Sequence, residues 1–169
     1  GNLENIADLL SHERLSFVHG DIRDAGLMAE LVADVDVIVN AAAESHVEKS
    51  ILEGASEFVT TNVEGTQILL DAIRETPVER FLLISSSEVY GTAETDPMDE
   101  RHPLEPRSPY AAAKAFAFYT TLNYREAYGM HAVNGILFNH ESPRRGESFV
   151  TRKITRAATR IKEGLQEKL

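Results

Sequence analysis

Short apolar runs alternate along this chain with longer segments that have the residue spacing of amphipathic helices. Such alternation is typical of βαβ units, in which parallel strands form a sheet and the helices between them pack on it. The runs that predict strands are residues 15–18, 35–39, 81–84 and 131–138. The segments that predict helices are residues 25–32, 56–75 and 110–128. The sequence therefore predicts an α/β fold with a parallel sheet.

Residues at the expected element ends agree with this assignment. Pro109 suits the first turn of a helix, and Gly129 suits the C-cap of the same helix. Residues 92–108 are rich in proline and acidic side chains, which predicts a surface loop between a strand and this helix.

Composition narrows the classes of function. The chain has 169 residues, 43% of them hydrophobic, which predicts a globular protein with a sizeable core. A formal net charge of −10 disfavours nucleic acid or an anionic membrane as the main partner. With no cysteine and no metal-like histidine spacing, we expect no disulfide, no thiol catalysis and no metal site. The sequence predicts a cytoplasmic protein without a membrane span.

Polar residues follow the predicted strands at the point where each strand ends. Asp21, residues 40–45, residues 85–88 and residues 139–141 have this position. In open α/β sheets, ligands bind at the carboxyl ends of the strands, so these segments predict a site at one edge of the sheet. Taken alone, residues 21–24 also fit a plain turn with a helix N-cap.

Tyr110 and Lys114 lie one helical turn apart, so both can point at one reacting atom. Ser86 and Glu88 can add a hydroxyl and a carboxylate from the end of a strand. A tyrosine acts as a base at neutral pH only if its pKa falls by about three units, roughly 4 kcal/mol, and a nearby ammonium contributes to that shift. The set predicts proton transfer, although the Tyr-Lys spacing also fits an ordinary solvated pair.

The same motifs carry a family resemblance. Residues 85–91, the Tyr110 and Lys114 pair, and residues 40–43 and 61–66 resemble the extended short-chain dehydrogenase/reductases that modify nucleotide sugars. Residues 134–147, and the run onward from residue 149, closely resemble GDP-mannose 4,6-dehydratases. Residues 20–24 and 42–47 look more like dTDP-glucose 4,6-dehydratases, whose motif usually carries Asp where Ser87 stands. The resemblance implies a Rossmann-like parallel sheet with helices on both faces.

The resemblance also implies a reaction. Tyr110, assisted by Ser86 and Lys114, would take the proton of the sugar 4-hydroxyl while hydride moves from C4 to a nicotinamide. Glu88 would then remove the C5 proton and help expel the C6 hydroxyl as water, after which hydride returns to C6. The alternatives that stay open are a dTDP-glucose 4,6-dehydratase, a UDP-glucuronate decarboxylase or epimerase, and a nucleotide-binding subunit without chemistry.

Binding residues follow from the same resemblance, as does assembly into a homo-oligomer, either a dimer or a tetramer, through a loop that contains Arg144. The cofactor is expected to be NADP, with NAD as the alternative. The residues expected to bind it are Asp21, Ile22, Ala41, Ala42, Ala43, Thr61, Tyr110, Lys114, Asn139 and Arg145. The residues expected to face the nucleotide sugar are Ser45, Ser87, Asn139, Val150 and Lys153.

Neither the first strand nor the Gly-rich turn of a dinucleotide-binding fold is recognisable in the chain. Residues 1–169 are therefore expected to be a partial dinucleotide-binding domain, with residues 139–169 as the start of the substrate-binding region and most of that region lacking. Such a sheet would keep unpaired edges, so we expect these residues by themselves to be unstable or inactive.

Overall fold

A computed structural model describes residues 2–93, 95 and 97–169. Two compact units make up the chain: residues 19–138 form one, and residues 1–18 together with 139–169 form the other. The unit of residues 19–138 contains the sheet and the predicted catalytic residues. The predicted loop 92–108 has no helix or strand among its described residues, and its residues 94 and 96 lie outside them.

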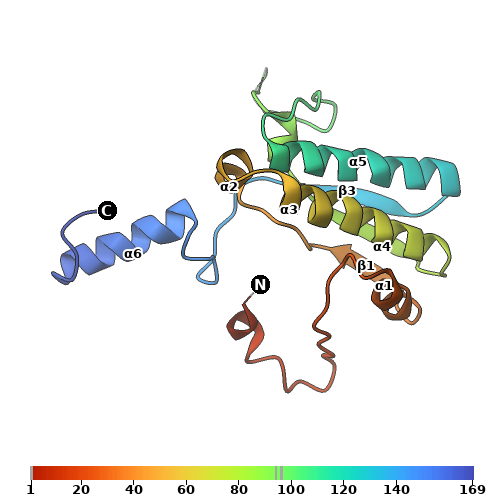
Figure 1. Cartoon of the computed structure of the whole chain (residues 1–169), viewed down its shortest axis with the longest axis horizontal. Coiled ribbons are helices and arrows are strands. Elements are labelled where there is room, and N and C mark those ends of the chain that lie inside the picture. Colours follow the sequence, from red (N-terminus) through yellow and green to blue (C-terminus); the bar gives the residue numbers. More distant parts are fainter. Residues whose placement is uncertain (1, 94, 96) are drawn as a thin grey trace. The chain divides into compact units, whose positions relative to one another are not determined.

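The sheet has three parallel strands in the order β1-β2-β3, of which β1 and β3 are labelled in Figure 1. β1 is Val37–Asn40, β2 is Arg80–Ser86 and β3 is Ala132–Leu137. Their register places Ile38 beside Phe81, and Phe81 beside Ala132. The predicted α/β class with a parallel sheet is confirmed, and the three strand predictions differ from the observed ranges only at their ends.

The strand predicted at residues 15–18 is wrong, because this segment has no regular structure. A strand persists only where a neighbour takes up its backbone N–H and C=O groups. Within the described residues, the sheet pairs β1 with β2 and β2 with β3, and no further strand takes part. Apolar side chains alone therefore did not make this segment a strand, and Leu15, Phe17 and Val18 are exposed.

Helices pack on one face of the sheet. α4 (Gly65–Arg74) and α5 (Pro109–Tyr128) cover it, and α1 (Ala25–Val32) packs beside α4. The core between these elements contains Val32, Leu69, Leu70, Ile73, Phe81, Leu83, Ala117, Tyr124 and Ala132. Val37 and Val39 point to the opposite face and are more than half exposed. The predicted helical cover on both faces is thus found, among the described residues, on one.

The helix predicted at residues 56–75 is interrupted in its middle. It comprises α3 (Ser56–Phe58), a π-helical turn η2 (Val59–Glu64) and α4. Asn62, at the centre of η2, is 1% exposed, and its side-chain amide binds the backbone of residue 44 instead of pointing to solvent. A π-turn adds a residue to the helical turn, and such turns are frequent at functional sites.

Several short elements and one longer helix were not predicted. They are η1 (Leu3–Ile6), α2 (Val47–Leu52), η3 (Ser87–Tyr90) and α6 (Val150–Lys162). The first three are too short for a periodic pattern to reveal, and α6 has an arginine-rich sequence. None of the helices in the described part of the chain is both long and apolar enough to cross a membrane.

Candidate active site at the carboxyl end of β2

The end of β2 presents a serine and a glutamate in a fixed turn. Ser86 is the last residue of β2, and its Oγ accepts a hydrogen bond from the backbone N–H of Glu88 at 3.2 Å. This contact caps η3, in which Val89 and Tyr90 are buried while Glu88 is exposed. The local sequence thus anchors the turn by its apolar residues and leaves the carboxylate of Glu88 at the surface.

The N-terminus of α5 positions Tyr110. Ser108 is the N-cap, and its side chain accepts from the N–H of Ala111 at 3.1 Å. The N–H of Tyr110 donates to the Oγ of Ser50 at 3.3 Å. The phenol ring packs edge-on against the buried Phe58, with ring centroids 6.4 Å apart. Backbone and ring of Tyr110 are therefore both held by groups outside its own helix.

Lys114 joins α5 to the sheet. Its Nζ donates to the carbonyl oxygen of Ile84 in β2 at 2.8 Å, and the residue is only 5% exposed. Burial disfavours the charged ammonium and lowers the pKa of Lys114 to about 8. An ammonium carries three N–H donors, and the hydrogen bond to Ile84 uses one of them. The others suit hydroxyl groups of a ligand or of Tyr110.

This contact fixes the level of Tyr110 along the sheet. Because β2 and β3 are parallel, α5 runs back between them, opposite in direction to β2. Going from Lys114 to Tyr110 covers four helical residues, about 6 Å, and going from Ile84 to Ser86 covers two strand residues, about 6.6 Å, in the same direction. These rises place Tyr110 at about the level of Ser86 along β2, and Glu88 lies in the turn that follows.

The loop after β1 lies at the same edge of the sheet as the end of β2. The Oδ1 of Asn40 accepts from the N–H of Ala42 at 3.1 Å. Asn62 binds Glu44 twice, by accepting from its N–H and donating to its carbonyl oxygen, both at 2.9 Å. The residues that were expected here lie in or beside this loop: Ala41, Ala42, Ala43, Ser45 and, on η2, Thr61.

Sequence reasoning missed Asn62 and Ser50 as parts of this arrangement. Asn62 stands in a pattern that otherwise predicts a helix, and the sequence gives no sign that its side chain is buried. Ser50 lies on α2, which was not predicted, so nothing in the sequence related it to Tyr110. Both residues act by contacts between segments that are distant in sequence.

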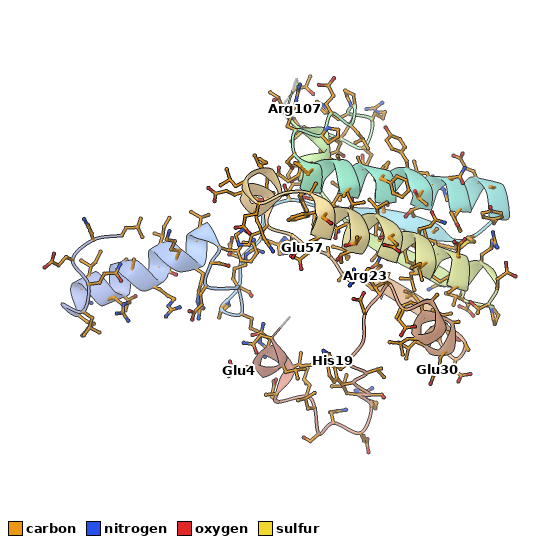
Figure 2. The ribbon with its side chains drawn as sticks, in the orientation of Figure 1. Glu4, His19, Arg23, Glu30, Glu57 and Arg107 are labelled. Atoms are coloured by element: carbon orange, nitrogen blue, oxygen red, sulfur yellow. The ribbon has the colours of Figure 1, made fainter. Side chains whose placement is uncertain are left out.

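The turn before α1 carries Asp21 and Ile22, which were expected to bind the cofactor. Asp21 pairs with Arg23, which is labelled in Figure 2, at 2.7 Å, and this hydrogen-bonded pairing lowers the pKa of the Asp21 carboxyl to about 2. Ile22 packs against α4 at Gly65, where an added Cβ would lie 2.4 Å from the Cγ2 of Ile22. Ile22 is therefore set by close packing, and Asp21 by its ion pair.

The remaining predicted residues belong to the unit formed by residues 1–18 and 139–169. Arg145 stacks on the ring of Phe149, 3.8 Å from its centroid, and pairs with Glu141 at 3.6 Å. Arg144 binds the backbone carbonyl of Asn5 and pairs with Asp8 at 3.5 Å. Exposed side chains in this unit that were expected to bind a ligand are those of Asn139, Val150 and Lys153.

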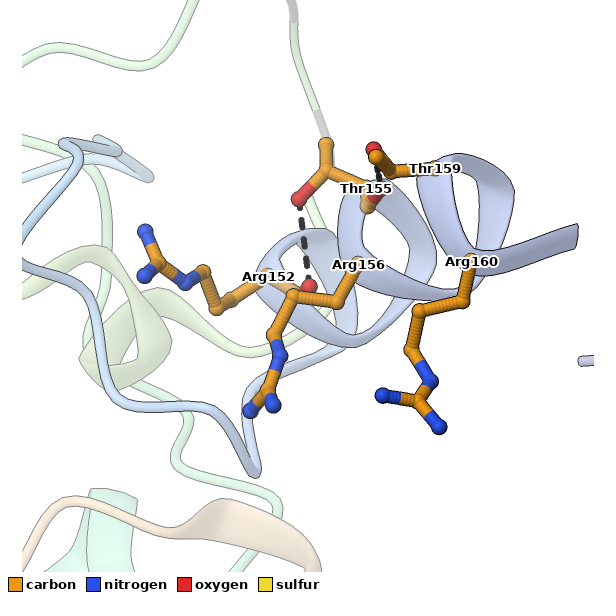
Figure 3. A pocket seen from close by; sticks show the side chains of 5 residues that line it. All are labelled: Arg152, Thr155, Arg156, Thr159 and Arg160. Atoms are coloured by element: carbon orange, nitrogen blue, oxygen red, sulfur yellow. Dashed lines mark hydrogen bonds between the residues drawn. The ribbon is translucent and has the colours of Figure 1, made fainter. Parts of the chain in front are cut away.

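One face of α6 has an unpredicted basic surface. A shallow hollow of about 350 Å³, drawn in Figure 3, is lined by Arg152, Thr155, Arg156, Thr159 and Arg160. The three guanidinium groups already contact the carbonyl oxygen of Pro143, the carboxylate of Glu147 and the side chain of Gln166. The threonine hydroxyls donate to carbonyl oxygens within the helix. These donors thus serve the structure of the unit itself.

No group of three or more His, Asp or Glu side chains that could hold a metal ion occurs among the residues that the structure describes. The side chains near the end of β2 offer a hydroxyl, a carboxylate, a phenol and an ammonium, those of Ser86, Glu88, Tyr110 and Lys114.

Comparisons with known proteins give the site a context. The whole sequence, residues 1–169, matches the family model described as GDP-mannose 4,6 dehydratase. A GDP-mannose 4,6-dehydratase of Yersinia enterocolitica is 49% identical over 157 residues, which cover 89% of this chain and 42% of that protein. The chain thus spans about half the length of the curated relatives it matches.

Two solved structures are similar in fold. DesIV, a dTDP-glucose 4,6-dehydratase of Streptomyces venezuelae with NAD bound, has a TM-score of 0.87 and 41% identity, over 97% of this chain and 50% of that one. RMD of Pseudomonas aeruginosa, complexed with NADPH, has a TM-score of 0.82 and 28% identity, over 96% of this chain and 58% of that one.

Proposed function

The chain belongs to the GDP-mannose 4,6-dehydratase family, and on that premise we propose that it is part of a hydro-lyase that converts GDP-mannose to GDP-4-keto-6-deoxymannose. The observation that carries the proposal is the contact of Lys114 with Ile84, which aligns Tyr110 with Ser86 beside the exposed Glu88. This set combines a base for oxidation of a hydroxyl with a carboxylate for elimination.

In the first step, Tyr110 takes the proton of the sugar 4-hydroxyl. Lys114, one turn away, stabilises the phenolate by its positive charge, and Ser86 donates its hydroxyl hydrogen to the sugar oxygen. The pKa of Lys114 near 8 leaves the ammonium charged at neutral pH, as this role requires. Anchoring by Phe58 limits the motion of the ring, which favours transfer at a fixed distance.

In the second step, Glu88 acts on the 4-ketone. The ketone acidifies the hydrogen on C5, and the carboxylate of Glu88 removes that proton. The same proton then leaves with the C6 hydroxyl as water, and the C5=C6 double bond forms. Glu88 is suited to this task because its backbone N–H is held by Ser86 while the residue is exposed.

A nicotinamide nucleotide fits the residues at this edge. When bound, its nicotinamide accepts a hydride from C4 and gives one back to C6. Lys114 has N–H donors for ribose hydroxyls, and Thr61 and residues 41–43 border the same strand ends. We assign Asp21 and Ile22 to its adenine, and Asn139 and Arg145 to its nicotinamide and phosphate ends. NADP is the proposed form, and the known structures of similar fold hold NAD or NADPH.

Residues of the unit formed by residues 1–18 and 139–169 are also assigned to the substrate. Residues 139–169 are proposed as the start of the substrate-binding region, and the division of the chain after Phe138 supports this boundary. The sugar nucleotide is assigned to Ser45, Ser87, Asn139, Val150 and Lys153. Relatives named GDP-mannose 4,6-dehydratase at 45–50% identity support GDP-mannose as the substrate.

We also propose that the protein is a cytoplasmic homo-oligomer, a dimer or tetramer. Two aromatic side chains on α5, Phe116 and Tyr119, are 44% and 56% exposed, and burying them in a subunit contact would be favourable. Light scattering on the purified protein tests this, because a monomer at micromolar concentration would contradict it.

The function is tested by incubating the purified whole protein, of which this chain is proposed to be a part, with GDP-mannose and NADP and identifying the product by mass. Loss of one water with no net change in cofactor absorbance is expected. Glu88→Gln should block elimination and leave reduced cofactor and the 4-keto sugar bound. Glu79→Gln, an exposed glutamate just before β2, is the matched control and should retain full activity. An active Glu88→Gln protein would refute the assigned role.

A second candidate is a dTDP-glucose 4,6-dehydratase, which the similarity to DesIV favours. The same incubation with dTDP-glucose separates the two. Turnover of dTDP-glucose without turnover of GDP-mannose would select the second candidate and leave the roles of Tyr110 and Glu88 unchanged.

A further inference from the structure

We propose that Ser50 is a positioning residue for Tyr110, an inference that rests on the function proposed above. Ser50 lies on α2 and is 1% exposed. Its hydroxyl donates to the carbonyl oxygen of Val47 at 2.6 Å and accepts from the backbone N–H of Tyr110 at 3.3 Å. One buried hydroxyl thus links α2 with the residue that carries the proposed base.

The first turn of α5 explains why this contact matters. The early N–H groups of a helix have no partner within it and need one from outside. Pro109 has no N–H, the N–H of Ala111 binds the side chain of Ser108, and that of Ala112 binds the carbonyl oxygen of Ser108. The N–H of Tyr110 receives its acceptor from Ser50, so without that hydroxyl a donor in a buried residue loses its partner.

Ser50 also connects Tyr110 with the loop after β1. α2 begins directly after that loop, and the N–H of Ser50 donates to the carbonyl oxygen of His46 at 3.0 Å. The loop itself is held by Asn62 through Glu44. A series of hydrogen bonds therefore connects the proposed cofactor-binding loop with the proposed base. The hydrogen bond between Ser50 and Tyr110 is the last in this series.

The consequence is a fixed distance between Tyr110 and the sugar bound beside that loop. Tyr110 keeps the contact of its ring with Phe58 when the hydroxyl of Ser50 is removed, so the phenol remains near its place but gains freedom at its backbone. Proton transfer is sensitive to such freedom, whereas binding of the nucleotide part of the substrate is not.

The experiment compares Ser50→Ala with the unchanged protein. We expect kcat to fall about tenfold, the equivalent of one hydrogen bond, with KM for the sugar nucleotide changed less than twofold. The isotope effect with substrate deuterated at C4 should increase, because hydride transfer becomes more limiting. Ser50→Cys, of similar size and with a weaker acceptor, should give an intermediate kcat, and it replaces the alanine variant if that variant does not fold.

Thr121→Val is the matched control. Like Ser50, Thr121 has a buried hydroxyl, but it lies on α5 and donates within that helix to the carbonyl oxygen of Ala117. It should lower stability without changing kcat or the isotope effect. Equal losses of kcat in both variants, or an unchanged kcat in Ser50→Ala, would overturn the proposal.

Amide hydrogen exchange of Tyr110 separates this proposal from the proposed function. Ser50→Ala should make the Tyr110 amide exchange at least about tenfold faster, because its acceptor is lost. Unchanged exchange would refute the contact in any case. An unchanged protein that turns over neither sugar nucleotide would instead refute the proposed function, while the exchange result would still decide whether Ser50 holds Tyr110.

Discussion

Replacing Lys114 with methionine should stabilise the folded protein at neutral pH and abolish turnover. Lys114 is 5% exposed, and its ammonium makes a hydrogen bond to Ile84. Burial lowers the pKa of Lys114 from 10.5 to about 8, which means that the folded protein is less stable while this group is charged. Methionine has a similar length and no charge, so it fills the same space without that cost.

The size of the effect follows from the pKa shift. A shift from 10.5 to about 8 corresponds to about 3 kcal/mol, since one pKa unit is about 1.4 kcal/mol. Below pH 8 both folded and unfolded Lys114 are protonated, and the full cost applies. Between pH 8 and 10.5 the unfolded chain binds more protons, so the unfolding free energy of the native protein rises with pH. The lost hydrogen bond to Ile84 opposes the gain by about 1–2 kcal/mol at every pH.

The assay is urea unfolding of both proteins at pH 7 and at pH 10.5. The stability of Lys114→Met relative to the native protein should fall by about 3 kcal/mol between these pH values. Lys49→Met is the control, because Lys49 pairs with Glu57, which raises the pKa of Lys49 and gives the opposite trend. If the unfolding free energy of Lys114→Met differs from that of the native protein by the same amount at both pH values, burial does not set the pKa of Lys114.

Three further predictions concern packing within the unit of residues 19–138. Tyr124→Phe should cost about 1 kcal/mol in urea unfolding, because Tyr124 donates to Asp71 at 2.5 Å. That hydrogen bond lowers the pKa of Asp71, so native stability is lost as pH falls through the range of the carboxyl, and a stability curve below pH 5 should be flatter in the variant. Gly65→Ala should weaken cofactor binding, measured by titration, because its Cβ would lie 2.4 Å from Ile22. Gly129→Ala, at φ +67° with open space around it, should cost about 1 kcal/mol in unfolding and leave binding unchanged.

The fold was predictable where periodicity and end signals agree. The ranges of α1 and α5 were predicted almost to the residue, since Asp24 caps the first and Pro109 and Gly129 bound the second. Residues 15–18 have an equally clear apolar pattern but form no strand. Their apolar pattern fits a strand, but a strand depends on a partner that the pattern does not contain.

The chemistry of the candidate site could be proposed from the sequence, but the contacts that support it could not. Tyr110 and Lys114 stood out by their one-turn spacing, and Glu88 by the resemblance of residues 85–91 to a known family, and their catalytic roles are proposals. The hydrogen bond of Lys114 to Ile84 joins residues 30 positions apart, and that of Ser50 to Tyr110 joins residues 60 apart. No local pattern encodes such contacts, because the topology of the sheet creates them.

These contacts have a common physical form that bears on how the site works. Lys114, Asn62 and Ser50 each use a buried polar atom to reach the backbone of another segment. Such groups contribute little net stability, and a buried ammonium reduces it, so apolar residues of similar size would give a more stable fold. These polar groups instead hold their partners in defined positions, because a hydrogen bond fixes the position of its partner more narrowly than apolar packing does. A sheet edge built in this way exchanges stability for a fixed geometry around Tyr110, which is why Lys114→Met is expected to be the more stable protein and the inactive one.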